Sequence, residues 1–233
     1  MNEQQRSVQN IPKTIIILLI LSLGGQVIWH YQLPPPNTTV KKLTQPPQTG
    51  LLNILCFGDK IVSAKLIMLW LQAFDVQAGQ FLSYKKLDYI KLQKWLEQIL
   101  LIDPNSQYPL LAASHLYSSV SDHEKQRLML EFVYQQFFID PEKRWPWLAH
   151  VTVVAKHRLK DLPLALKYAK AISDYATPNM PRWAKEMQIF ILEDMGELEQ
   201  ARLVIGGMLA SGQLTDHKEI EFLNEKLLDL EKK

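Results

Sequence analysis

The side chains that could bind a metal ion or transfer a proton are spread thinly along this sequence. Its six histidines stand at positions 30, 115, 123, 150, 157 and 217. Only His150 and His157 fall near one face of one helix, and the two helical turns between them separate the pair by about 10 Å. A zinc ion held by both would need further ligands at closer spacing. We therefore interpret the pair as residues of a surface or groove and expect no metal site.

Motifs of known enzyme classes are absent from the sequence. It contains no glycine-rich phosphate loop, no H-E-x-x-H, no G-x-S-x-G and no zinc-ligand spacing. The single cysteine, Cys56, excludes an internal disulfide and a multi-cysteine metal site, and we interpret it as a small buried apolar residue. The net charge of +2 provides no concentrated basic face for nucleic acid. We expect a protein that is not an enzyme and needs no cofactor.

An apolar segment near the N-terminus is long enough to cross a bilayer. Thr14–Leu33 supplies 20 residues without an acidic or basic side chain other than histidine, which is the length of a membrane-spanning helix. Trp29 and Tyr31 lie near its end, where aromatic side chains favour the membrane interface. The sequence predicts a short cytoplasmic tail at residues 1–13 and a transmembrane anchor at residues 14–33.

A cleaved signal peptide is the alternative for this segment. Arg6 and Lys13 would form its charged region, and Ser22 and Gly24 would be the small residues that a signal peptidase reads. Both interpretations export the rest of the chain, since a first hydrophobic segment behind a short basic tail leaves the N-terminus inside. We expect a single-pass protein of a bacterial inner (cytoplasmic) membrane, with a C-terminal domain that is periplasmic or otherwise extracytoplasmic.

Prolines separate this segment from the remainder of the chain. Residues 34–50, PPPNTTVKKLTQPPQTG, are rich in proline and threonine and show no apolar periodicity. This composition predicts an extended, semi-rigid linker. Residues 51–233 then form the second domain, where abundant Leu, Ala, Lys, Gln and Glu favour helices.

Two similar peptides, LLIDP ending at Pro104 and FFIDP ending at Pro141, indicate a repeat of 37 residues. The same step leads on to Pro178 and then to Thr215. A second set of prolines keeps nearly the same interval, at Pro109, Pro146 and Pro181. Proline suits the first turn of a helix and cannot continue one. Each unit is therefore predicted to contain a proline-marked start, a helix, a turn, a second helix and a proline-marked stop.

Apolar residues at helical spacing predict that this domain is all-α. In residues 162–172 and 198–209 they recur at intervals of three and four. The expected helices are Asp59–Asp75, Leu87–Leu101, Pro109–Ser119, Asp122–Ile139, Pro146–Arg158, Leu162–Tyr175, Pro181–Asp194, Leu198–Leu209 and Asp216–Glu231.

Two segments, RLKDLPLALKYAKAI and MGELEQARLVIGGMLASG, resemble second helices of tetratricopeptide repeats. That family places a glycine-containing turn five residues before a small residue where two helices touch. Gly196 and Ala201 match this pattern, and Ala165 matches it with Lys160 in place of the glycine. The resemblance implies an α-solenoid of about four helical hairpins with a C-terminal capping helix, although the period is 37 and not 34 residues. The whole chain is also similar to membrane-anchored proteins of proteobacteria, a resemblance that implies no activity.

The tetratricopeptide resemblance implies a concave groove, lined by the first helix of each pair, that binds a peptide. The family's inward positions correspond to Tyr117, Trp147, His150, His157, Arg158, Trp183, Glu186, Phe190, Glu193 and Asp194. The dense aromatic and basic stretch EKRWPWLAH adds Arg144 and Trp145. Aromatic side chains beside arginine and carboxylates are typical anchors of protein interfaces. The alternative is that Trp147, Trp183 and Phe190 belong to the core between helices.

We therefore expect a non-enzymatic scaffold or adaptor that binds a protein or peptide partner through this groove, within a membrane-bound assembly. The alternative is an accessory structural subunit that assembles mainly through its transmembrane helix. Ser22, Gly24 and Gly25 would then provide the small-residue surface for close helix contact. An enzyme is the third class, and no motif supports it.

Overall fold

The structure is a computed structural model that describes residues 12–32, 42–47, 50–52, 58–74, 76–77, 80–81, 84–177, 179–212, 214 and 216–232. Its contacts divide the chain into an N-terminal unit, which contains helix α1, and a helical body, which contains every helix from α3 onward. Cys56, Pro178, Thr215 and most of the predicted tail and linker lie outside the described residues.

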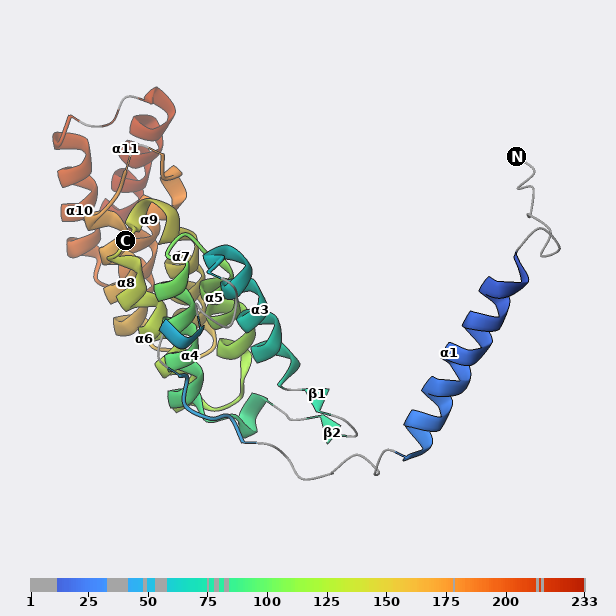
Figure 1. Ribbon diagram of the computed structural model, residues 1–233. Helices are drawn as coiled ribbons and strands as arrows, with labels where there is room; N and C mark the ends of the chain where they lie inside the picture. The colour runs from blue at the N-terminus through green and yellow to red at the C-terminus, as the bar shows by residue number, and fades with distance from the viewer. Residues whose placement is uncertain are drawn as a thin grey trace, which may run out of the picture. The chain divides into compact units, whose positions relative to one another are not determined.

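The N-terminal unit is built on helix α1, Lys13–Gln32 (Figure 1). Its ends differ by one residue each from the predicted anchor, and none of its side chains is buried. Its 20 residues make a helix of about 30 Å, which matches the hydrocarbon thickness of a bilayer. By length and composition α1 can cross a membrane, and a signal sequence has the same properties.

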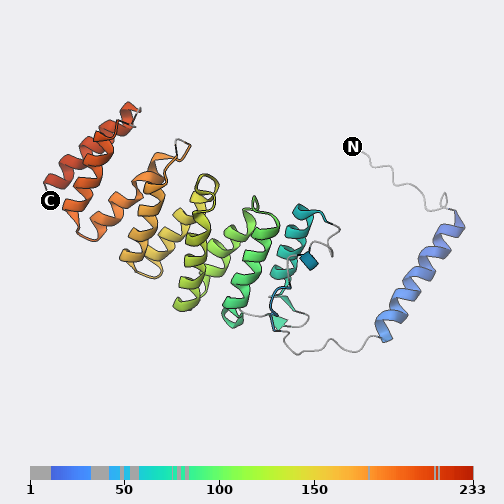
Figure 2. The same ribbon diagram turned by 60° about the vertical axis from the view of Figure 1, so that its left-hand side comes forward.

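The body consists of helices that pack in the order in which the chain makes them, and from α6 to α11 each helix packs on the next (Figure 2). A short ribbon of β1 (Val76–Gln77) and β2 (Gln80–Phe81) and the 3-10 turn η2 (Tyr84–Lys86) connect α3 to α4. The predicted all-α class is confirmed. The helices are α3 (Lys60–Ala73), α4 (Tyr89–Ile102), α5 (Tyr108–Leu111), α6 (His123–Phe137), α7 (Pro141–His157), α8 (Leu162–Asp174), α9 (Arg182–Asp194), α10 (Leu198–Ala210) and α11 (His217–Glu231).

Aspartate residues begin six of the described helices. The N-caps of α3, α4, α6, α7, α8 and α11 are Asp59, Asp88, Asp122, Asp140, Asp161 and Asp216. Each carboxylate accepts a hydrogen bond from a backbone N–H of the first turn, as Asp59 does from Val62 at 3.0 Å. Such a cap pairs a donor that the helix itself leaves unpaired.

The repeated I-D-P peptide has two different roles. Asp140 caps α7 and Pro141 is its first residue, so this proline begins a helix and the predicted stop was wrong. Pro104 lies instead in the turn after α4, since α5 begins only at Tyr108. Pro146, predicted as the start of α7, lies inside that helix. The Asp140 cap explains why the prediction failed, because α7 begins at Pro141, five residues before the predicted start at Pro146.

The predicted helix Pro109–Ser119 is irregular. Helix α5 passes into a π-helix, η3 (Ala112–Leu116), and then into a 3-10 turn, η4 (Tyr117–Ser119). Serine hydroxyls bond to backbone carbonyls here: Ser118 donates to Ser114 and Ser119 donates to His115. Such local hydrogen bonds compete with a regular helix. π-Helical turns are rare and frequently occur at functional sites.

Two hydrophobic cores lie along the body. The larger core runs from Leu43 and α3 to α9, and the smaller core lies between α9, α10 and α11. Helix α9 contributes to both, with Ile191 in the larger core and Leu192 in the smaller one. Short helices of this kind cannot bury their apolar faces alone, so each pair depends on its neighbours.

Arg144 of α7 joins three segments inside the larger core. Its guanidinium donates to the backbone carbonyl of Gln136 at 2.8 Å, to the side-chain oxygen of Gln136 at 3.0 Å and to the carbonyl of Pro104 at 2.9 Å. The side chain is only 2% exposed, and this burial lowers its pKa, against the opposing effect of Asp140. We therefore reassign Arg144 from the predicted groove to the core, because its hydrogen bonds go to the ends of α4 and α6.

Replacing Arg144 with Met keeps a long side chain and removes its donors. The carbonyls of Pro104 and Gln136 then lose a buried partner, so we expect the free energy of unfolding to fall by about 2–4 kcal/mol. Urea unfolding of the full chain in detergent, followed by circular dichroism, measures this change. The matched control is Arg158→Met at the exposed end of the same helix, with an expected effect below about 0.5 kcal/mol. Equal effects of the two variants would show that the Arg144 hydrogen bonds do not stabilise the fold.

Candidate functional site

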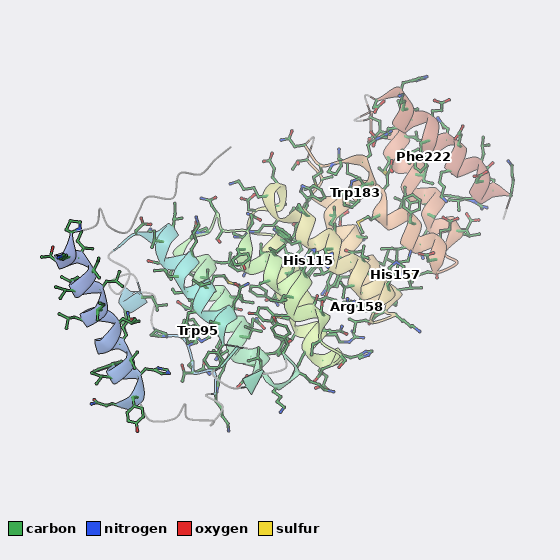
Figure 3. All side chains as sticks on the ribbon, turned by 90° about the vertical axis from the view of Figure 1, so that its right-hand side faces the viewer. Trp95, His115, His157, Arg158, Trp183 and Phe222 are labelled. Atoms are coloured by element: carbon green, nitrogen blue, oxygen red, sulfur yellow. The ribbon has the colours of Figure 1, made fainter. Side chains whose placement is uncertain are left out.

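Alternate elements of the body meet along one surface, which we call the odd-helix face and define by η3, α7, α9 and α11. The rings of Trp145 on α7 and Trp183 on α9 lie 5.5 Å apart, and those of Phe190 on α9 and Phe222 on α11 lie 6.4 Å apart. In Figure 3 the labelled His115, Trp183 and Phe222 follow one another along the body. The structure thus brings together predicted groove residues from separate helices.

A stack of two imidazole rings joins η3 to α7. The rings of His115 and His150 are nearly parallel and 3.5 Å apart. Trp147 meets His115 edge-on at 6.0 Å and donates its indole N–H to Gln107 Oε1 at 2.7 Å. Burial lowers the pKa of His150 to about 4, and the charges of His115 and Arg158 add to this, so His150 is neutral near pH 7. His150 and Trp147 are therefore half-buried packing residues of the face.

Tyr117 of η4 was predicted for the groove but lies in the core. Its ring meets Tyr84 and Tyr89 edge-on, with centroids 5.7 Å and 6.5 Å away. The hydroxyl of Tyr89 also donates to the carbonyl of Tyr117 at 3.0 Å. We reassign Tyr117 to the packing between α4 and the irregular segment, because aromatic rings surround it there.

The exposed part of the odd-helix face is aromatic and basic. Trp183 is 53% exposed and Phe190 is 38% exposed, while Trp145 is half-buried. His157 and Arg158 are exposed at the C-terminal end of α7 (Figure 3). Of the predicted groove residues, these four and Asp194 are exposed.

The two carboxylates predicted at the end of α9 form ion pairs within the chain. Glu193 pairs with Lys226 of α11 at 2.5 Å, and Asp194 pairs with Lys156 of α7. Lys226 also lies 5.3 Å from the centroid of the Phe190 ring. A partner would have to displace these pairs to use the carboxylates, so the aromatic side chains are easier to reach.

The predicted groove residue Glu186 is buried on α9 beside Glu219 of α11, which is also buried. Burial raises the pKa of Glu186 and the charge of Glu219 raises it further, whereas Arg182 and Lys185 oppose the change. Among the described residues, one oxygen of each carboxylate has no hydrogen-bond partner. Glu219 also lines a cleft of about 1300 Å³ between the α8–α9 connection, α10 and α11. The two charges therefore weaken the packing of α11 on α9.

Sequence reasoning missed three contributors to the odd-helix face. His115 and Gln107 belong to the irregular segment around α5. Phe222 lies on the last helix, which was predicted as a capping helix and not as part of the groove. The repeat interval could have identified His115, because it stands about one repeat before the predicted groove residue His150. His115 and His150 are 35 residues apart, close to the repeat of the prolines.

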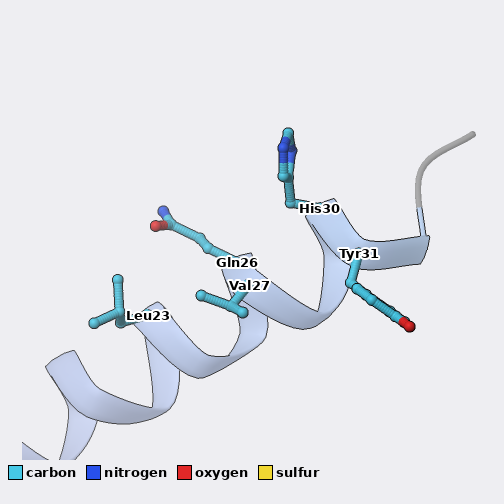
Figure 4. A pocket seen from close by; sticks show the side chains of 5 residues that line it. All are labelled: Leu23, Gln26, Val27, His30 and Tyr31. Carbon is cyan, nitrogen blue, oxygen red and sulfur yellow. The ribbon is translucent and has the colours of Figure 1, made fainter. Parts of the chain in front are cut away.

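Helix α1 carries the residues predicted for close helix contact. Ser22, Gly24 and Gly25 are exposed, and a Cβ added at either glycine would meet no atom within 4 Å. A shallow hollow of about 340 Å³ is formed by side chains of this single helix (Figure 4), namely Leu23, Gln26, Val27, His30 and Tyr31. Another helix could therefore approach α1 closely at the glycines.

No family model, curated protein or solved structure matches this chain. Its fold defines an all-helical protein with one N-terminal apolar helix. No group of three His, Cys, Asp or Glu side chains gathers for a metal ion within the described ranges. The tetratricopeptide resemblance rests on the repeat interval and on the residues that carry it.

Glu186→Gln should stabilise the body at neutral pH. The pKa of Glu186 is raised in the folded state, so ionising this carboxyl costs stability. Its contribution to the free energy of unfolding is therefore fully present at low pH and is lost as the pH rises through the pKa of the folded state. A glutamine carries no charge and can donate to Glu219, so we expect a Tm higher by about 2–4 °C at pH 7 and no gain near pH 4. Thermal unfolding at both pH values measures this, with Glu221→Gln on the exposed side of α11 as the control. A gain that does not depend on pH would contradict the argument.

Proposed function

We propose that this chain is a membrane-anchored, non-enzymatic scaffold that binds a protein or peptide partner through the odd-helix face. The observation that carries the proposal is the set of exposed aromatic side chains Trp183, Phe190 and Phe222 on α9 and α11. His157 and Arg158 add exposed nitrogen donors at the end of α7. Aromatic and arginine side chains provide most of the binding energy at protein interfaces.

We also infer that the body is a tetratricopeptide-like α-solenoid of about four hairpins, with α11 as its cap. Polar contacts at a nearly constant interval support this inference. Asn179 bonds to Glu142, 37 residues away, and Lys143 bonds to Asn105, 38 residues away. A stack of repeats produces such contacts between equivalent positions of neighbouring units. The interval agrees with the 37 residues between Pro104 and Pro141.

Anchoring would strengthen a weak interaction. Helix α1 is long and apolar enough for a single-pass anchor. We place this anchor in a bacterial inner membrane, with the body on the extracytoplasmic side. A partner that is itself bound to that membrane meets the body at a raised effective concentration, so modest contacts suffice for a stable assembly. The scaffold would act by holding such partners together.

The test compares the full chain with a Trp183→Ala, Phe190→Ala variant. Truncating these two exposed aromatic side chains should lower the affinity for the partner at least about tenfold, because an aromatic residue at the centre of an interface contributes on the order of 2 kcal/mol. Affinity purification in mild detergent with mass spectrometry identifies the partner, and titration with that purified partner measures its affinity. The matched control is Leu203→Ala on α10, where the side chain is 76% exposed but lies off the face. Equal affinity of both variants would exclude the odd-helix face as the binding site.

A second candidate function is an accessory subunit that assembles through α1. The free space around Gly24 and Gly25 favours it, because two helices could approach there to backbone contact. Replacing both glycines with Leu should then release the chain from its complex, whereas a scaffold that uses the odd-helix face would keep its partner. Co-purification measures this, with Leu19→Ile and Leu21→Ile as the volume-conserving control. Retention of the complex by the leucine variant would exclude this function.

A further inference from the structure

Helix α3 is apolar on both of its sides. One side, which includes Ala64, Met68 and Leu71, is buried in the larger core. The other side, which we call the α3 outer face, is formed by Ile61, Val62, Leu66, Leu69 and Trp70, and these side chains are 42–62% exposed. Helical spacing places all five on one half of the helix. Folded proteins rarely leave a contiguous apolar surface of this kind uncovered, so it marks an interaction site.

The charge around α3 favours an anionic partner. Residues 33–87, which follow α1, contain six lysines and two acidic residues, whereas residues 88–233 contain 18 basic and 21 acidic residues. Lys65 falls on the outer side of α3 and is exposed, and Lys60 is exposed at the start of the same helix. An apolar helix face with lysines beside it is typical of segments that lie in a membrane interface. Anionic lipid headgroups attract such lysines.

Few residues separate the end of α1 from the first buried residue of the body. Leu43 is buried in the larger core, and Trp95 of α4 donates its indole N–H to the carbonyl of Thr44 at 2.9 Å. The ring of Trp70, on the α3 outer face, lies 4.7 Å from the ring of Trp95. One end of this face is therefore next to the point where residues 43 and 44 pack on the body. Ten residues, 33–42, separate Leu43 from the end of α1. A chain of that length spans at most about 40 Å, which is less than the predicted 34–50 linker would allow.

We propose that α3 lies in the interface of the bilayer that holds α1. Its outer face contacts the acyl chains at the headgroup boundary, and Lys60 and Lys65 contact anionic headgroups. The proposal rests on the membrane anchor of the proposed function and adds a second membrane contact to it. With two contacts the body keeps a defined orientation at the membrane, which a single point of attachment does not provide.

The test uses the full chain in phospholipid vesicles, with Cys56 replaced by Ala and one cysteine introduced for the environment-sensitive fluorophore NBD. Leu66→Cys and Leu69→Cys report on the α3 outer face. Leu203→Cys is the matched control on α10, and Leu18→Cys reports on α1. The vesicles contain phosphatidylcholine with phosphatidylglycerol or phosphatidylcholine alone, each with and without nitroxide-labelled lipid.

We expect labels at positions 66 and 69 to emit at shorter wavelength than the label at position 203. Nitroxide lipid should quench both, and more strongly in the vesicles with phosphatidylglycerol. If labels 66 and 69 match label 203 while label 18 is quenched, the interfacial helix is wrong and the anchor stands. If label 18 is not quenched, the anchor itself is wrong.

Other occupants of the face give different results. Short-wavelength emission without nitroxide quenching would mean that protein covers the α3 outer face, and it would overturn the proposal. A signal that disappears when vesicles outnumber chains would mean that a second copy covers it, which also overturns the proposal. Equal quenching in the two lipid mixtures would overturn the role of anionic headgroups.

Discussion

The guanidinium of Arg144 holds the connections of the helical body in register. Because it donates to the carbonyls of Pro104 and Gln136, the turn after α4, the last turn of α6 and the first turns of α7 cannot shift independently. Trp147 and His150 follow on α7 and contact the irregular segment around η3. The odd-helix face is thus positioned by buried hydrogen bonds, so its exposed aromatic side chains are free for other contacts.

The helices were predictable because their signals are local. Helix α8 begins at the predicted Leu162 and ends one residue early, since an N-cap aspartate and the apolar spacing act within a few positions. The irregular segment was not predictable in this way. Pro109 and the alanines after it favour a helix, but the hydroxyls of Ser118 and Ser119 bond to carbonyls four residues back and disturb its regular ladder.

The candidate site was predictable in residue type and less so in exposure. Trp183 and Phe190 are exposed on one helix, as a groove requires. Arg144 was placed on the surface because arginine is usually exposed, and its burial depends on two carbonyls that come from distant parts of the chain. The same holds for Glu193, whose partner Lys226 lies 33 residues away on another helix. Local pattern contains no information about such pairings.

Helix α9 belongs to both hydrophobic cores, and this limits the cooperativity of the body. α10 and α11 can detach from α9 by opening the smaller core while the larger one stays closed. Glu186 and Glu219 lie at this boundary and lower the cost of opening it. We therefore expect the C-terminal helices to form a separate foldon, whose amide protons exchange with solvent sooner than those of α6 to α8. A partner that contacts both Phe190 and Phe222 would bind only the state in which α11 is packed on α9. It would therefore stabilise that state, and the whole body would then unfold as one cooperative unit.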